Sequence, residues 1–142
     1  MSVPERRARA GFTLIEVLVV VVVIGLLAGL VAPNVFRNLG VARESTAQSQ
    51  GAMLAAALDA YRLDNGRYPS TEQGLDALWV TPTLPPAPRN WAGPYLRRPP
   101  PLDPWNNTYV YSLDDESRFH LVTLGADGRE GGEGEDADLT LW

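Results

Sequence analysis

The sequence predicts an α+β fold: one long N-terminal helix packed on a small C-terminal antiparallel sheet, with a metal-binding loop. Three observations lead to this prediction. An apolar run of 21 residues, 12–32, stands close to the N-terminus, and an alanine-rich amphipathic segment continues it to residue 65. Two short segments of alternating character fill residues 109–124. A glycine-rich acidic stretch follows them.

The apolar run has the length of a membrane-spanning helix. Twenty-one helical residues extend about 30 Å, the thickness of a bilayer's hydrocarbon core. Three arginines and one glutamate precede the run, and such a basic flank stays in the cytoplasm, so the rest of the chain is expected to be translocated. A secretory signal peptide fits poorly, because no clear small-x-small cleavage site follows the run. A plain uncleaved anchor remains an alternative.

Glu16 is the unusual residue of this run, because Thr13 is the only other polar residue in it. A carboxylate in an apolar span costs several kcal/mol unless it is neutral, paired or near the interface. The sequence therefore predicts that Glu16 has a cationic partner.

Beyond residue 34 the pattern predicts a helix that ends at Asn65 and Gly66. A short helix capped by Ser70 or Thr71 is expected next, running to about Trp79. An extended proline-rich segment follows, which its aromatic residues should hold against the domain. Residues 109–113 and 119–124 are expected to form two strands, joined by a turn at 114–117, that lie on the C-terminal half of the helix.

The acidic stretch, residues 127–138, carries six acidic residues and four glycines. Such a loop opposes its own folding through charge repulsion and the entropy of ordering glycine. A calcium ion, which takes six to eight oxygen ligands in a flexible loop, would offset both effects. An EF-hand is rejected, because Arg129 and Gly131 occupy ligand positions. A solvated acidic tail is the alternative.

Composition excludes several functions. The net charge of -5 argues against nucleic acid as a partner, and the lack of cysteine excludes disulfides and thiolate metal sites. His120 is the only histidine, expected as a packed or edge side chain of a strand. No catalytic grouping stands out, so the sequence predicts that the protein is not an enzyme.

Six motifs in this order resemble those of the major pseudopilins of type II secretion systems, within the type IV pilin-like superfamily, and they cover nearly the whole chain. The first alone is shared with type IV pilins. The motifs are Gly11-Phe12-Thr13-Leu14-Ile15-Glu16, Asp64-Asn65-Gly66-Arg67-Tyr68-Pro69, Thr71-Glu72-Gln73-Gly74-Leu75, Trp91 with Gly93-Pro94-Tyr95-Leu96, Asp103-Pro104-Trp105, and the acidic glycine loop. Asn106 and Asn107 depart from the family, which usually has a glycine after the tryptophan.

The resemblance implies that a peptidase cuts after Gly11 and that the new N-terminal Phe12 is methylated. It assigns Glu16 to assembly, paired with the α-amino group of the mature N-terminus in the same or the adjoining subunit. It also implies a structural calcium ion in the C-terminal loop. The expected ligands are the carboxylates of Asp127, Asp136 and Asp138 and the carbonyl of Leu124, with the register of Asp136 against Asp138 open.

The implied organisation is a cleaved basic leader at 1–11, a transmembrane and assembly helix at 12–33, and a periplasmic domain at 34–142. The implied function is that of a structural subunit polymerising into the periplasmic pseudopilus of a type II secretion system. Its expected partners are further copies of itself, minor pseudopilins, an inner-membrane platform protein, the prepilin peptidase and methyltransferase, and inner-membrane lipid before assembly. Two alternatives stay open: a type IV or competence pilin, which would usually bring a C-terminal cysteine pair, and a membrane-anchored extracytoplasmic binding domain.

Overall fold

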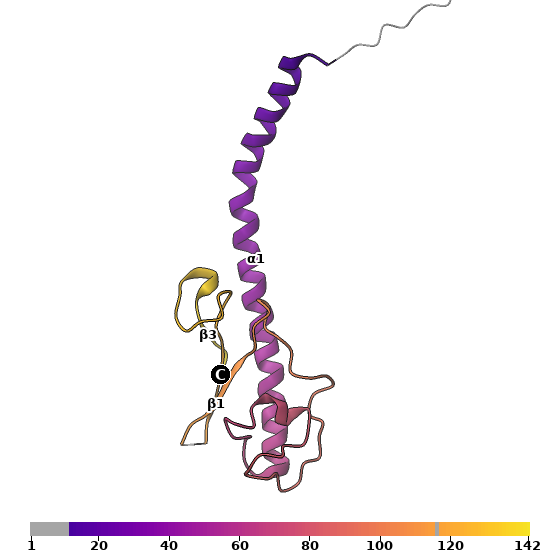
Figure 1. Cartoon of the computed structure of the whole chain (residues 1–142), viewed down its shortest axis with the longest axis vertical. Coiled ribbons are helices and arrows are strands. Elements are labelled where there is room, and N and C mark those ends of the chain that lie inside the picture. The colour runs from indigo at the N-terminus through magenta and orange to yellow at the C-terminus, as the bar shows by residue number, and fades with distance from the viewer. Residues whose placement is uncertain (1–11, 116) are drawn as a thin grey trace, which may run out of the picture. The chain divides into compact units, whose positions relative to one another are not determined.

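The structure is a computed structural model that describes residues 12–115 and 117–142, with the backbone only for residues 31–38. The chain divides into two compact units, Met1–Leu39 and Gly40–Trp142. The predicted leader, with Gly11, lies outside the described residues. The elements in chain order are α1 (Leu14–Asn65), the 3-10 helix η1 (Leu75–Leu78), β1 (Val110–Leu113), β2 (Phe119–Thr123), the 3-10 helix η2 (Gly134–Asp136) and β3 (Leu139–Thr140) (Figure 1).

Helix α1 confirms the long helix that the two sequence patterns predict, and it ends where expected. The side-chain amide of Asn65 donates to the carbonyl of Tyr61 at 2.9 Å, and the N–H of Gly66 donates to the carbonyl of Arg62 at 2.7 Å. These bonds satisfy carbonyls that the helix end would otherwise leave open. Among the described residues, no helix meets the length and apolarity that crossing a membrane requires.

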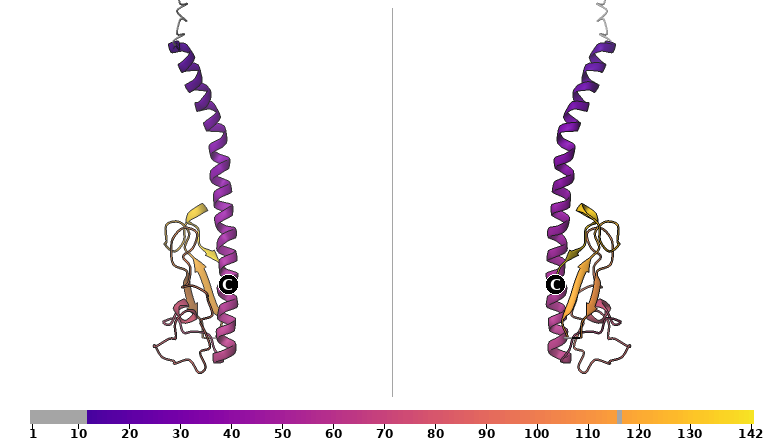
Figure 2. Two further views of the ribbon diagram at one scale, coloured as in Figure 1. Left: turned by 90° about the vertical axis from the view of Figure 1, so that its right-hand side faces the viewer. Right: turned by 90° about the vertical axis from the view of Figure 1, so that its left-hand side faces the viewer.

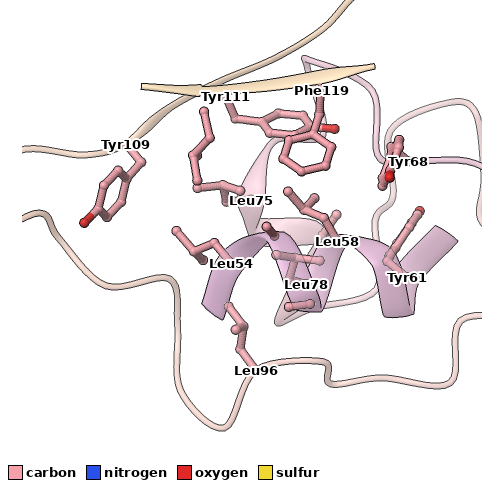
Figure 3. Close-up of a cluster of buried hydrophobic side chains, with 14 residues drawn as sticks. Leu54, Leu58, Tyr61, Tyr68, Leu75, Leu78, Leu96, Tyr109, Tyr111 and Phe119 are labelled. Carbon is pink, nitrogen blue, oxygen red and sulfur yellow. The ribbon is translucent and has the colours of Figure 1, made fainter. Parts of the chain in front are cut away.

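The core of the second unit forms between one face of α1 and the sheet. Leu54, Leu58 and Tyr61 are fully buried, and their spacing of three and four residues places them on one side of the helix (Figure 3). The views in Figure 2 show β1 and β2 lying alongside the C-terminal half of α1. The other large members of the core are Tyr68, Leu75, Leu78, Leu96, Tyr109, Tyr111, Phe119 and Leu121.

The sheet has three antiparallel strands in the order β1–β2–β3. Tyr111 pairs with Leu121 between β1 and β2, and Thr123 pairs with Leu139 between β2 and β3. Sequence analysis found β1 and β2 but missed β3, because two residues are too few to show an alternating pattern. The third strand and the residues after it bring the C-terminal segment back against the core.

The close approach of the C-terminal segment to α1 requires a glycine in that helix. Gly51 is buried, and a Cβ atom placed there would lie 2.9 Å from Cβ and from Cδ1 of Leu141. Leu141 packs against the hydrophobic core, and its N–H donates to the carbonyl of Leu121 at 2.8 Å. Gly51 therefore lets the C-terminal segment approach the helix more closely than any side chain would allow.

The segment between α1 and β1 is pinned to the core, as the sequence predicts. The helix expected up to Trp79 is only the four-residue η1, because Gly74 has a φ of 59°, outside the helical region. Before it, Ser70 and Gln73 exchange two hydrogen bonds, and the amide of Gln73 donates to the carbonyls of Leu84 and Pro86. Trp91 donates its indole N–H to the carbonyl of Ala77 at 2.9 Å, which holds the proline-rich segment in place.

Candidate functional site

The first candidate site is the N-terminal end of α1. Thr13 precedes the helix, and its hydroxyl oxygen accepts a hydrogen bond from the N–H of Glu16 at 3.3 Å. In return, the Glu16 carboxylate accepts one from the N–H of Thr13 at 3.4 Å. This reciprocal pair is a capping box, which satisfies two backbone donors that a helix start leaves open. Sequence analysis missed it, although Thr-x-x-Glu is its sequence signature.

The side chains that follow this capping box are apolar and exposed. Every described side chain from Phe12 to Leu30 is exposed, and the valines, leucines and isoleucines among them cover all sides of the helix. Soluble monomers rarely present so large a continuous apolar surface, and such surfaces mark contacts with protein or lipid. The structure therefore presents Glu16 at one end of a helix whose surface is suited to burial against other molecules.

The second candidate site is the acidic glycine loop, residues 124–138, whose two ends touch. The N–H of Ala126 donates to the carbonyl of Glu135 at 2.8 Å. A Cβ atom at Gly125 would lie 2.7 Å from the same carbonyl oxygen and 2.9 Å from that of Ala137. The stretch that holds Leu124 and Asp127 therefore packs directly on the stretch that holds Asp136 and Asp138.

The predicted carboxylates help to fold the loop. Asp127 accepts a hydrogen bond from the N–H of Arg129 at 3.0 Å, and Asp138 accepts one from the N–H of Gly131 at 2.9 Å. Asp136 lies in η2, and Leu124 directly follows β2. Within the described part of the chain, however, no three acidic or histidine side chains are grouped so that they could hold a metal ion.

The fit of calcium to this loop is therefore partial. The donor chemistry suits calcium, since carboxylate and carbonyl oxygens come from two segments in backbone contact. The tight approach of Gly125 to Glu135–Ala137 also keeps these two segments in direct contact. The carboxylates themselves have to turn toward a common point, because two of them are directed at backbone N–H groups.

Two residues outside the loop fix its starting point, and sequence analysis did not assign them this role. The side-chain amide of Asn107 donates to the carbonyl of Gly125 at 2.7 Å. The backbone N–H of Asn107 donates in turn to the carboxylate of Asp103 at 2.8 Å. Asn106 between them has a φ of 71°, the left-handed conformation in which glycine is favoured. Asparagine adopts this conformation more readily than most other residues, so Asn106 allows a turn that glycine would also allow.

Asp103 is a buried carboxylate, 3% exposed, that organises this region. It accepts hydrogen bonds from the N–H of Trp105 at 2.9 Å and from the hydroxyl of buried Thr123 in β2. Burial and, secondarily, the charge of Asp103 raise the pKa of the Tyr109 phenol to about 12. Asp103 thus joins the turn at residues 103–107 to the strand from which the acidic loop leaves.

His120 lies in β2, the central strand of the sheet, and its side chain is exposed, so the prediction of a packed or edge side chain is wrong. Its Nε2 lies 3.4 Å from a carboxylate oxygen of Asp114, which itself accepts two hydrogen bonds from Arg118. The backbone N–H of Arg118 is the main cause that lowers the pKa of Asp114. These bonds hold the two ends of the β1–β2 turn together.

Two family models match successive parts of the chain. A model of the prokaryotic N-terminal methylation motif matches residues 6–32, and a model of the type II secretion system protein G family matches residues 34–142. The chain is 48% identical over 139 residues to the type II secretion system core protein G of Pseudomonas aeruginosa, covering 97% of this chain and 98% of that one. It is 49% identical over 140 residues to the protein of the same name from Vibrio cholerae, covering 97% and 94%.

A solved structure supports the fold. The crystal structure of the major pseudopilin from the type 2 secretion system of enterohaemorrhagic Escherichia coli matches with a TM-score of 0.65 and 40% sequence identity. The match covers 76% of this chain and 93% of that one.

The methylation motif, the long helix and the small antiparallel sheet define a subunit of the pilin-like class. Within that class, the chain belongs to the type II secretion system protein G family. It is a major pseudopilin, a structural subunit of the pseudopilus.

Proposed function

We propose that this chain is processed after Gly11, methylated at Phe12 and then polymerised through its N-terminal helix into a periplasmic pseudopilus that drives export of folded proteins. The observation that carries the proposal is the helix surface exposed on all sides from Phe12 to Leu30. Burying apolar surface stabilises by about 25 cal/mol per Å² relative to water, so a helix that leaves the lipid is stabilised by packing among copies of itself.

Glu16 supplies the specificity in this proposal. In a stack of apolar helices, Glu16 meets the α-amino group of a mature N-terminus. An ion pair in that surrounding costs far less than an isolated carboxylate. The capping box with Thr13 holds Glu16 at the helix end, where such a pair forms.

The partners and location follow from this assembly. Before polymerisation the apolar helix is held in the lipid of the bacterial inner membrane, with the domain in the periplasm. The prepilin peptidase and methyltransferase act at Gly11 and Phe12, and an inner-membrane platform protein adds subunits to the fibre. Minor pseudopilins are part of the same fibre as copies of this chain. The chain acts as a structural component and not as an enzyme, and its net charge of -5 argues against nucleic acid as a main partner.

The experiment that tests this proposal compares Glu16→Gln with Glu16→Asp. Glutamine keeps the capping box, since either Glu or Gln serves at that position, but it removes the charge. Fibre yield in a reconstituted secretion system is expected to fall at least about tenfold in Glu16→Gln, because a hydrogen bond to a charged group contributes about 1.5–3 kcal/mol. Glu16→Asp is expected to assemble better than Glu16→Gln.

Intact-mass measurement of the wild-type protein and the variants from the same reconstituted system is expected to show loss of residues 1–11 and one added methyl group on Phe12. Fibres formed equally by Glu16→Gln would contradict the role of the charge. An unprocessed N-terminus in assembled wild-type fibres would contradict the proposed maturation.

We further propose that the acidic glycine loop binds a structural calcium ion through the carboxylates of Asp127, Asp136 and Asp138 and the carbonyl of Leu124. A bound calcium ion would neutralise part of the loop's charge and accept several oxygen ligands at once. The support for this proposal is the contact between residues 125–126 and residues 135–137, which joins the two chain segments that carry these four residues.

Removal of calcium is expected to lower the melting temperature of the full-length chain in detergent. A ligand present at 100 times its dissociation constant stabilises by about 2.7 kcal/mol, and a chelator abolishes that gain. Asp127→Asn, which keeps an oxygen for the Arg129 N–H, is expected to weaken calcium binding in a titration. Glu130→Gln removes one charge from the same loop and is expected to bind as the wild type does. Equal melting temperatures with calcium and with chelator would refute the calcium site.

A further inference from the structure

One ion pair joins the acidic glycine loop to a distant part of the chain. Arg43 of α1 donates from Nη1 to the Glu135 carboxylate of η2 at 2.9 Å, and the two residues stand 92 positions apart. Both side chains are partly exposed, 36% for Arg43 and 46% for Glu135.

The same glutamate makes two more contacts. A Cβ atom at Gly40 would lie 3.4 Å from the other carboxylate oxygen of Glu135, so the carboxylate rests on the helix surface at Gly40. The backbone carbonyl of Glu135 accepts the N–H of Ala126. Glu135 therefore contacts the helix with its side chain and the start of the loop with its backbone. Gly40, Arg43 and Glu135 form what we name the loop clasp.

The helical turns under the loop clasp have little else to hold them to the domain. No residue of α1 from Gly40 to Thr46 is buried, and Ala47 is the first that is. Gly40 is also the first residue of the second compact unit. Helical turns without tertiary packing are marginally stable in water, so a contact from outside the helix matters most here.

We propose that the loop clasp makes the acidic glycine loop and residues 40–46 of α1 open and close as one unit, with Arg43 as the positioning residue of the loop. A divalent cation that orders the loop then also orders these turns. Because such coupling is reciprocal, the factor by which the cation stabilises the closed clasp is also the factor by which loss of Arg43 weakens binding of the cation. The coupling to the cation rests on the proposed calcium site, whereas the joint opening of the loop and residues 40–46 does not.

Hydrogen exchange of the full-length chain in detergent, measured by mass spectrometry, tests the coupling without metal. Arg43→Ala and Glu135→Gln are each expected to speed exchange about two- to fivefold, both in residues 40–46 and in the loop amides of residues 126–136, as expected for removing a partly exposed ion pair. Alanine forms helix at least as well as arginine, so faster exchange in Arg43→Ala does not come from helix propensity.

Two further variants complete the design. The charge exchange of Arg43→Glu with Glu135→Arg restores an ion pair and is expected to return both segments toward wild-type exchange. Arg89→Ala removes an exposed arginine for which the structure records no bond to the described residues, and it is expected to exchange as the wild type does. Unchanged exchange in Arg43→Ala, or faster exchange in only one of the two segments, overturns the proposal.

A second arm repeats these measurements with calcium chloride and with a chelator. Calcium is expected to slow exchange in residues 40–46 of the wild type, and to do so less in Arg43→Ala, with calcium affinity about two- to fivefold weaker in that variant. Equal or tighter calcium binding by Arg43→Ala overturns the coupling of the cation to the clasp. If the wild-type loop binds no calcium in this titration, the calcium site fails, and the metal-free arm alone then decides the loop clasp.

Discussion

Gly51→Val is expected to lower the free energy of unfolding by about 2–4 kcal/mol. Overpacking a well-packed site typically costs 1–3 kcal/mol and occasionally more. Here even the first added carbon atom would lie 2.9 Å from two carbon atoms of Leu141. Leu141 has little freedom to retreat, because it is hydrogen-bonded to Leu121 of β2. The gain in helix propensity on replacing glycine is below about 1 kcal/mol and does not offset this cost.

Gly40→Ala provides the matched control on the same helix. There the nearest atom to the new Cβ is a carboxylate oxygen of Glu135, at 3.4 Å, which belongs to the flexible end of a side chain. The propensity gain should then prevail, and the variant is expected to match or exceed the wild type by up to about 1 kcal/mol. Urea unfolding followed by circular dichroism measures both variants. A Gly51→Val protein as stable as the wild type would mean that the C-terminal segment does not need this close approach.

The contrast between these two glycines shows where sequence reasoning ends for this fold. Both weaken the helix by the same propensity argument, and nothing near either position in the sequence separates them. Their roles are decided by Leu141 and Glu135, about 90 residues further along the chain. Long-range contacts of this kind leave no local pattern.

Features with local signals were predictable. The end of α1 at Asn65, the hairpin of β1 and β2, and the pinned proline-rich segment all follow from neighbouring residues, and all are confirmed. The capping box of Thr13 and Glu16 also has a local signature, Thr-x-x-Glu, although it was not predicted. The calcium ligands remain a prediction.

The role of Asp103 in holding the start of the acidic glycine loop could not be predicted from the sequence. In the sequence, Asp103 stands out only as part of the motif Asp103-Pro104-Trp105, and its partner Thr123 is 20 residues away in β2. Only the fold shows that the carboxylate is buried and that it accepts bonds from Trp105, Asn107 and Thr123. Asp103 is therefore a structural residue, and its substitution is expected to have a large effect on the free energy of unfolding.

Asp103→Ala is expected to lower the free energy of unfolding by about 3–5 kcal/mol. The substitution leaves the N–H groups of Trp105 and Asn107 and the hydroxyl of Thr123 without their acceptor, and each buried polar group left unsatisfied costs about 1–3 kcal/mol. Asn107 would also lose the contact that orients it toward Gly125, so the acidic loop should exchange its amides faster. Urea unfolding and hydrogen exchange measure the two effects.

Asp103→Asn is the informative control, because it separates hydrogen bonding from charge. The amide oxygen still accepts the two backbone N–H groups, and the Thr123 hydroxyl can accept from the new NH₂ group, so the loss of stability is expected to be well below that of Asp103→Ala. The negative charge is gone, however, and that charge is the second cause, after burial, that raises the pKa of Tyr109 to about 12. In the folded Asp103→Asn protein, ultraviolet absorbance should therefore show the Tyr109 phenolate appearing at a lower pH. If Asp103→Asn were as unstable as Asp103→Ala, the ionised carboxylate itself, and not its hydrogen bonds, would be what holds the turn to β2.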